Sequence, residues 1–94
     1  MKIFDGFSNL KFINLGDNLL TKVRVDWIAS GNKIEQFHLT NNALAKPIDR
    51  SFIWRLQNAK IINLDGTGCT VSLDKFANPK QKFMEFYTTL VKSC

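Results

Sequence analysis

An apolar stripe near the C-terminus constrains this chain most, because a helix with one apolar side needs a second layer to cover it. Asn78 and Pro79 fit the N-cap and the first position of a helix. The stripe that follows recurs at spacings of three and four residues and comprises Phe83, Phe86, Tyr87, Leu90 and Val91. The pattern therefore predicts an amphipathic helix of about four turns, and the rest of the chain has to supply the surface that it covers.

The preceding residues are patterned mainly as strands. Lys22–Ala29 alternates apolar and charged side chains, which is typical of a half-buried strand. Ser30–Asn32 is a cluster of turn residues, and Lys33–Thr40 then continues in an extended pattern. We expect these two segments to pair as an antiparallel hairpin, with Leu10–Leu15 as a further strand.

The middle of the chain supports two interpretations. Asn41–Asp49 contains Pro47 and predicts a loop or a single helical turn. In Ser51–Leu56 a helix would place Ile48, Phe52, Leu56 and Ala59 on one stripe, whereas a strand would place Phe52, Trp54 and Leu56 on one face. We favour the strand, because Phe-Ile-Trp is a poor helical sequence and a helix would leave Trp54 on the polar side.

The stretch NLDGTGCTVSL, from Asn63 to Leu73, predicts a hairpin. Asp-Gly is a common turn pair, and the residues on both sides are patterned as strands, which argues against a phosphate-binding loop. A loop of two or four residues would align Ile62, Leu64, Cys69, Val71 and Leu73 on one face. We therefore expect Cys69 to be buried among aliphatic side chains.

These elements predict one α+β domain over residues 1–94. We expect a meander of about five to six antiparallel strands, forming a twisted sheet or a small open barrel, with the C-terminal helix covering it. We find no internal repeat. The chain is 45% hydrophobic, which is enough to form a core without disulfides.

The two cysteines, Cys69 and Cys94, are too few and too far apart for a disulfide framework. We interpret them as free thiols in a reducing compartment. The first residues lack the basic and apolar regions of a signal peptide, and no apolar run approaches the ~20 residues that span a bilayer. These observations predict a cytoplasmic protein that does not contact membranes.

No motif predicts catalysis, a metal or a cofactor. Cys69 has a single histidine, His38, as its candidate base, and the predicted burial of Cys69 argues against a nucleophile. His38 has no second ligand at a suitable spacing, and the acidic residues are scattered along the chain. The sequence therefore predicts a non-enzymatic protein.

Our leading hypothesis is a small soluble binding module that contacts a protein partner or a second copy of itself. Short adaptors and inhibitors of phages and mobile elements are modules of this kind. Ile28 and Ile53 are predicted on faces opposite the main core pattern, so they are the candidate interface residues.

The alternative hypothesis is a nucleic-acid-binding domain. The net charge is +5, and bases alternate with aromatic residues along part of the chain. The candidate residues for this function are Lys22, Arg24, Arg50, Arg55 and Lys60. Ten of the thirteen basic residues are Lys, whereas readers of nucleic-acid grooves depend on Arg, so the basic composition is a weak argument.

Overall fold

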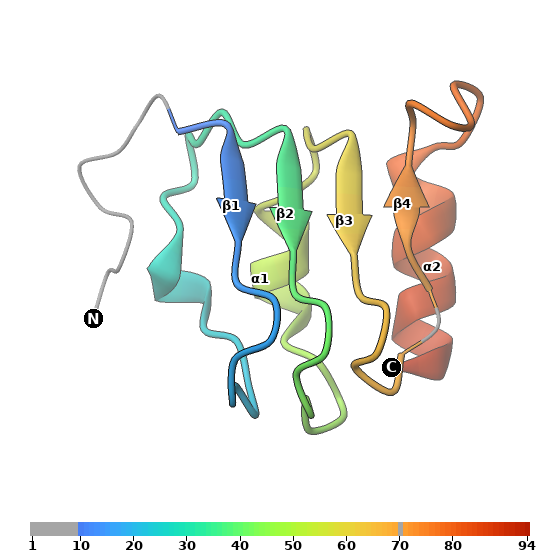
Figure 1. The fold of residues 1–94 in the computed structure, drawn as a ribbon. Helices are drawn as coiled ribbons and strands as arrows, with labels where there is room; N and C mark the ends of the chain where they lie inside the picture. Colours follow the sequence, from blue (N-terminus) through green and yellow to red (C-terminus); the bar gives the residue numbers. More distant parts are fainter. Residues whose placement is uncertain (1–9, 70) are drawn as a thin grey trace.

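The computed structural model describes residues 10–69 and 71–94, and it is a small α+β domain with one mixed sheet and a C-terminal helix (Figure 1). The elements in chain order are β1 (Phe12–Asn14), the 3-10 helix η1 (Val25–Trp27), β2 (Gln36–His38), α1 (Arg50–Trp54), β3 (Ile61–Asn63), β4 (Leu73–Asp74) and α2 (Phe83–Ser93). Both α-helices lie behind the sheet in the view of Figure 1. The predicted fold class and the predicted C-terminal helix are confirmed.

The strand order is β1-β2-β3-β4, and the first three strands are parallel. Phe37 at the centre of β2 pairs with Ile13 on one side and with Ile62 on the other. Only β4 is antiparallel, with Leu73 opposite Ile62. The predicted antiparallel meander of five to six strands is therefore wrong, and the sheet is not closed into a barrel. Parallel neighbours require crossover connections, and here these run through η1 and α1.

Each of the three parallel strands belongs to one copy of a repeated unit, so the expectation of no internal repeat is also wrong. Phe37 lies 24 positions after Ile13, and Ile62 lies 25 positions after Phe37. Each unit has apolar or small residues at its first, fourth, sixth and eleventh positions and a polar residue at its ninth. The three sets are Leu10, Ile13, Leu15, Asn18, Leu20; Ile34, Phe37, Leu39, Asn42, Leu44; and Ala59, Ile62, Leu64, Thr67, Cys69.

The polar residue of each unit bonds to the backbone of the turn after the strand. Asn42 is only 1% exposed, and its amide nitrogen donates to the carbonyl oxygens of Leu39, Thr40 and Leu15. Its amide oxygen accepts the N–H of Leu20 at 3.1 Å. Since Leu15 and Leu20 belong to the preceding unit, this one side chain links two successive units.

Thr67 and Asn18 occupy the equivalent position in the other two units. The Thr67 hydroxyl donates to Leu64 O at 2.6 Å and accepts the N–H of Cys69 at 3.3 Å. Asn18, which is exposed, donates to Leu15 O and Gly16 O. The same backbone turn is therefore held by a side chain in all three units.

The segment Lys22–Ala29 is not a strand, which corrects the predicted hairpin. It contains η1, and Trp27 and Ile28 are buried one after the other, whereas a strand would point consecutive side chains to opposite faces. The ring of Trp27 packs edge-on against Phe52 of α1, with centroids 6.1 Å apart, and Phe52 packs against Phe37 of β2 at 5.4 Å. This aromatic column joins η1, α1 and the sheet.

The segment Ser51–Leu56 forms most of α1, which ends at Trp54, and the turn that follows it, so our preference for a strand is wrong. Asp49 caps α1 by accepting the N–H groups of Ser51 and Phe52 at 2.9 and 3.3 Å. The helical stripe is buried, and it comprises Ile48, Phe52, Leu56 and Ala59. Trp54 lies on the outer side of the helix and is 42% exposed.

The predicted burial of Cys69 among aliphatic residues is confirmed, but the predicted loop of two or four residues is wrong, because β3 ends at Asn63 and its antiparallel partner β4 begins only at Leu73. Ile62, Leu64, Cys69 and Leu73 are all buried, and Val71 is half-buried against the same core. The connection between β3 and β4 is longer than a tight turn, and it takes positive φ angles of 75° and 86° at Gly66 and Gly68. These two positions use the conformational freedom of glycine.

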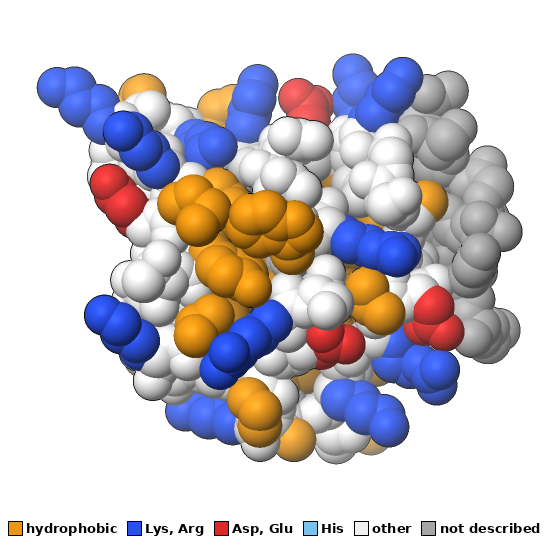
Figure 2. All heavy atoms as spheres, turned by 180° about the vertical axis from the view of Figure 1, so that it is seen from behind, with side chains coloured by type: hydrophobic (Ala, Val, Ile, Leu, Met, Phe, Trp, Pro, Cys, Tyr) orange, Lys and Arg blue, Asp and Glu red, His pale blue; other side chains and the backbone are white. Residues whose placement is uncertain are grey.

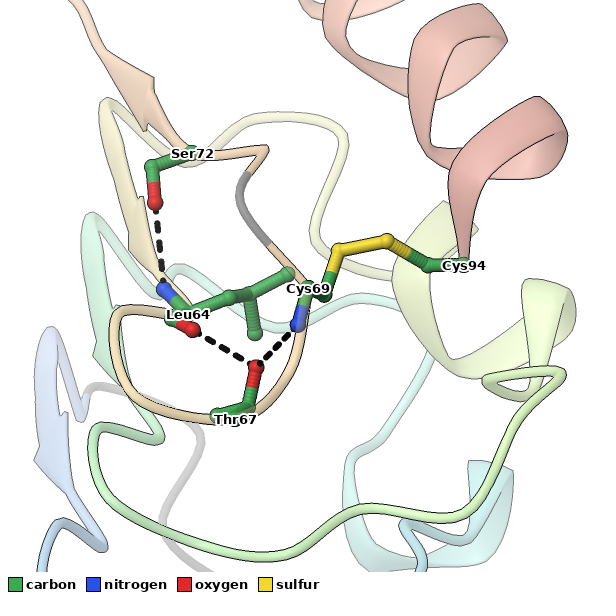
Figure 3. The surroundings of a disulfide bond; sticks show 5 residues. All are labelled: Leu64, Thr67, Cys69, Ser72 and Cys94. Carbon is green, nitrogen blue, oxygen red and sulfur yellow. Dashed lines mark hydrogen bonds between the residues drawn. A yellow bond between two sulfur atoms is a disulfide. The ribbon is translucent and has the colours of Figure 1, made fainter.

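Cys69 and Cys94 form a disulfide with Cα atoms 5.7 Å apart, which corrects the prediction of two free thiols. Figure 3 shows the bond joining the connection after β3 to the end of α2. The backbone N–H of Ile48 also donates to Cys94 O at 2.8 Å. Because α2 runs back along the sheet, two cysteines that lie 25 positions apart in the sequence meet in space.

The helix α2 begins at Phe83, with Lys82 as its N-cap, rather than after Asn78 as predicted. The intervening residues form turns that are held by side chains. Asp74 accepts the N–H groups of Phe76 and Ala77, and Gln81 bonds to the backbone of Asp74 and of Ser72. Phe83, Phe86 and Leu90 are buried as the predicted stripe requires.

Candidate functional site

The parallel strands expose six side chains on the side of the sheet away from the helices. In each strand the central residue is buried and its two neighbours are more exposed. Since side chains alternate along a strand, the neighbours project from the opposite face of the sheet. This surface, called the sheet face from here on, consists of Phe12, Asn14, Gln36, His38, Ile61 and Asn63. The side of the sheet away from the helices faces the viewer in Figure 1.

Register places these side chains in two rows across the sheet. Phe12 pairs with Gln36 and Gln36 with Ile61, while His38 lies between Asn14 and Asn63. Side chains of the two rows also contact each other. The rings of Phe12 in β1 and His38 in β2 lie 5.2 Å apart, and His38 Nε2 is 3.4 Å from Oε1 of Gln36 in the same strand. The sheet face thus combines a 53% exposed phenyl ring with hydrogen-bonding side chains.

Two asparagines of the sheet face are held in the same way in equivalent units. Asn14 Oδ1 accepts the N–H of Gly16 at 2.8 Å, and Asn63 Oδ1 accepts the N–H of Asp65 at 3.0 Å. None of the six side chains is Lys, Arg, Asp or Glu, so the surface is suited mainly to apolar contact and hydrogen bonds. Asp74 of β4 lies opposite Ile61 and places one carboxylate at the edge of this surface.

A groove lies on the helix side of the molecule. It is an open groove of about 860 Å³, called the helix-side groove from here on, and its lining includes Val25, Ser30, Arg50, Ser51, Trp54, Arg55, Gln57 and Tyr87. Arg55 is fixed there, because its Nη1 donates to the carbonyl oxygens of Val25 and Ile28. Arg50 is exposed at the first position of α1.

The five predicted nucleic-acid-binding residues do not form one surface. Arg50 and Arg55 share the helix-side groove. Lys22 lines a different cavity of about 200 Å³ together with Asp49. Arg24 forms an ion pair with Asp26 at 3.3 Å, and Lys60 forms one with Glu35 at 3.7 Å while also lying over the ring of Phe76. Carboxylates therefore offset the charge of two of the five predicted residues, Arg24 and Lys60.

The two predicted interface residues are core residues. Ile28 is 1% exposed and Ile53 is 0% exposed, so their predicted position opposite the core is wrong. Ile53 is buried because the segment is helical, and Ile28 because the chain turns at η1. Sequence reasoning missed Phe12 and His38, which the alternation around Ile13 and Phe37 places on the outward face.

Among residues 10–69 and 71–94, no three His, Cys, Asp or Glu side chains are arranged to hold a metal ion. In the same part of the chain, no helix has the length and apolar character needed to cross a bilayer. Comparisons with protein families, with curated proteins and with solved structures found no match.

Proposed function

We propose that this chain is a non-enzymatic protein-binding module that contacts its partner, or a second copy of itself, through the sheet face. The observation that carries this proposal is that none of the six outward side chains is Lys, Arg, Asp or Glu, together with the exposed ring of Phe12. Protein interfaces are depleted in charged residues at their centres and enriched in aromatic ones.

The repeated unit supports the same function. Its apolar positions and its ninth-position Asn or Thr resemble the pattern of leucine-rich repeats, in which each unit supplies one strand to a continuous parallel sheet. Stacked repeats of this kind create extended surfaces that bind other molecules. The resemblance concerns architecture, and the proposed function therefore rests on the side chains of the sheet face.

The proposed location also needs revision. The cytoplasmic location was inferred partly from free thiols, and the Cys69–Cys94 disulfide removes that support. Disulfides persist mainly in oxidising compartments such as the cell exterior. An extracellular binding module is consistent with the disulfide and with the sheet face.

Photo-cross-linking from the sheet face tests the proposal. We expect a photoreactive phenylalanine at position 12, introduced in the organism that makes the protein, to give one discrete adduct. Mass spectrometry identifies the partner, and an adduct at twice the 10.8 kDa mass of the chain indicates self-association. The same probe in place of Lys33, which is exposed and is not one of the six residues of the sheet face, is the control. Equal adducts at both positions, or none at position 12, would contradict the proposal.

The alternative function, nucleic-acid binding, is favoured by one observation, the presence of Arg50, Trp54 and Arg55 in one groove. Such binding would depend steeply on salt, because phosphate contacts release counterions. A single-stranded oligonucleotide that fails to bind at low salt would exclude this alternative.

A further inference from the structure

The helix side of the molecule exposes apolar surface that the core does not require. Trp54 is 42% exposed and Met84 is 53% exposed, while Tyr87, one turn after Met84 on α2, is half-buried. Figure 2 views this side of the molecule and shows apolar side chains gathered at its centre, with Lys and Arg side chains around them. Trp54 and Tyr87 both line the helix-side groove, so the apolar surface continues into it.

Trp54 is held rigidly enough to serve as an anchor for a ligand. Its ring packs edge-on against Tyr87 at 5.3 Å and against Phe83 at 5.9 Å, and the latter two rings stack on each other at 5.8 Å. A ring that is fixed before binding loses little entropy when a partner covers it. Exposed and ordered Trp and Tyr side chains are the residues that dominate binding energy at interfaces.

The groove beside this anchor is positively charged. Arg50 and Arg55 are the charged residues among its described lining residues, which include no carboxylate. Arg55 is positioned by two carbonyl oxygens, which orient the guanidinium without neutralising it. The groove therefore presents a fixed cation next to an exposed indole.

The positive charge of the helix-side groove favours some classes of binding partner over others. A symmetric contact between two copies would bring like-charged arginines together around the same patch, which is unfavourable. A nucleic-acid strand would need a row of cations along its backbone, and Lys22, Arg24 and Lys60 lie outside the groove. We propose that the helix-side groove binds a peptide segment of a protein partner that carries an acidic side chain beside an aromatic or aliphatic one.

Selection from a random peptide library on the immobilised oxidised protein tests this assignment. We expect the enriched peptides to place Asp or Glu next to Phe, Trp or Leu. Binding of the fluorescein-labelled peptides is measured by anisotropy, and R50E should weaken it about tenfold or more because it reverses a charge at the contact. W54A should weaken it at least as much. Circular dichroism and urea unfolding establish that both variants are folded.

Two matched variants separate this surface from others. K33E makes the same charge change at an exposed position outside the groove, and F12A removes the exposed ring of the sheet face. Both should leave the peptide affinity within about twofold of the original protein. The two proposals can therefore fail separately. A failure of peptide binding at the helix-side groove leaves the proposed function of the sheet face untouched, and a failure of cross-linking at position 12 leaves the groove proposal untouched.

Three outcomes would overturn the assignment. One is a library that yields no peptide whose binding depends on Arg50. Another is enrichment of peptides without acidic residues. The last is displacement of the peptides from the groove by a single-stranded oligonucleotide at physiological salt, which would assign the groove to nucleic acid.

Discussion

Asn42→Ala is expected to lower the free energy of unfolding by about 3 kcal/mol, because the substitution leaves buried backbone groups without partners. The N–H of Leu20 loses its acceptor and the carbonyl of Leu39 loses its donor, and the link to Leu15 in the preceding unit is broken. Urea denaturation followed by circular dichroism measures the loss.

Asn18→Ala is the matched control for this prediction. Asn18 has the equivalent position in the first unit, but it is exposed and water can replace its bonds to Leu15 and Gly16. We expect a loss below about 1 kcal/mol. Equal losses for the two variants would show that the polar position does not hold the units together.

Reduction of the Cys69–Cys94 disulfide is expected to lower the free energy of unfolding by about 3.5 kcal/mol, from the entropy of closing a loop of this length in the unfolded chain. The bond spans 25 positions and fixes the end of α2 to the connection after β3. Urea denaturation of the protein with and without a phosphine reductant measures the difference.

The double variant C69S/C94S controls for effects of the reductant. It should be about as unstable as the reduced protein, and the reductant should not change its unfolding. Alkylation of both cysteines in the native, unreduced protein would contradict the disulfide, and so would identical unfolding curves with and without reductant.

The sequence predicts the elements whose evidence is local. The stripe of α2 and the burial of Cys69 among aliphatic residues depend on residue spacing within a short segment, and both are confirmed. The start of α2 was misjudged because Asp74 and Gln81 hold the residues around Asn78 in turns. These side-chain contacts cannot be read from helix propensity.

The arrangement of the strands could not be read from alternation alone. A segment with alternating side chains fits an antiparallel or a parallel neighbour equally well. Alternation therefore predicts pairing of Lys33–Thr40 with the nearest such segment, Lys22–Ala29, whereas β2 pairs with β1 and β3. The repeated pattern predicts that equivalent strands are parallel neighbours. The pattern is difficult to recognise in the sequence because the third unit has Ala59, Thr67 and Cys69 where the second has Ile34, Asn42 and Leu44.

The candidate surfaces depend on these corrections. Once Ser51–Leu56 is a helix, Trp54 and Arg55 line one groove, whereas a strand would have put them on opposite faces. Ile53 moves into the core for the same reason. The sheet face forms only when β1, β2 and β3 are parallel neighbours, because their outward residues are distant in sequence.

The parallel stacking of β1, β2 and β3 is the central claim, because the sheet face depends on it and because α1, which lines the helix-side groove, is part of the crossover between β2 and β3. Nuclear Overhauser contacts between backbone protons test it most directly. Phe37 should show contacts to Ile13 and to Ile62, in the pattern of amide and Hα protons that parallel strands produce. A short Hα–Hα contact between Val25 and Phe37, as in an antiparallel hairpin of residues 22–29 and 33–40, would contradict the repeated architecture.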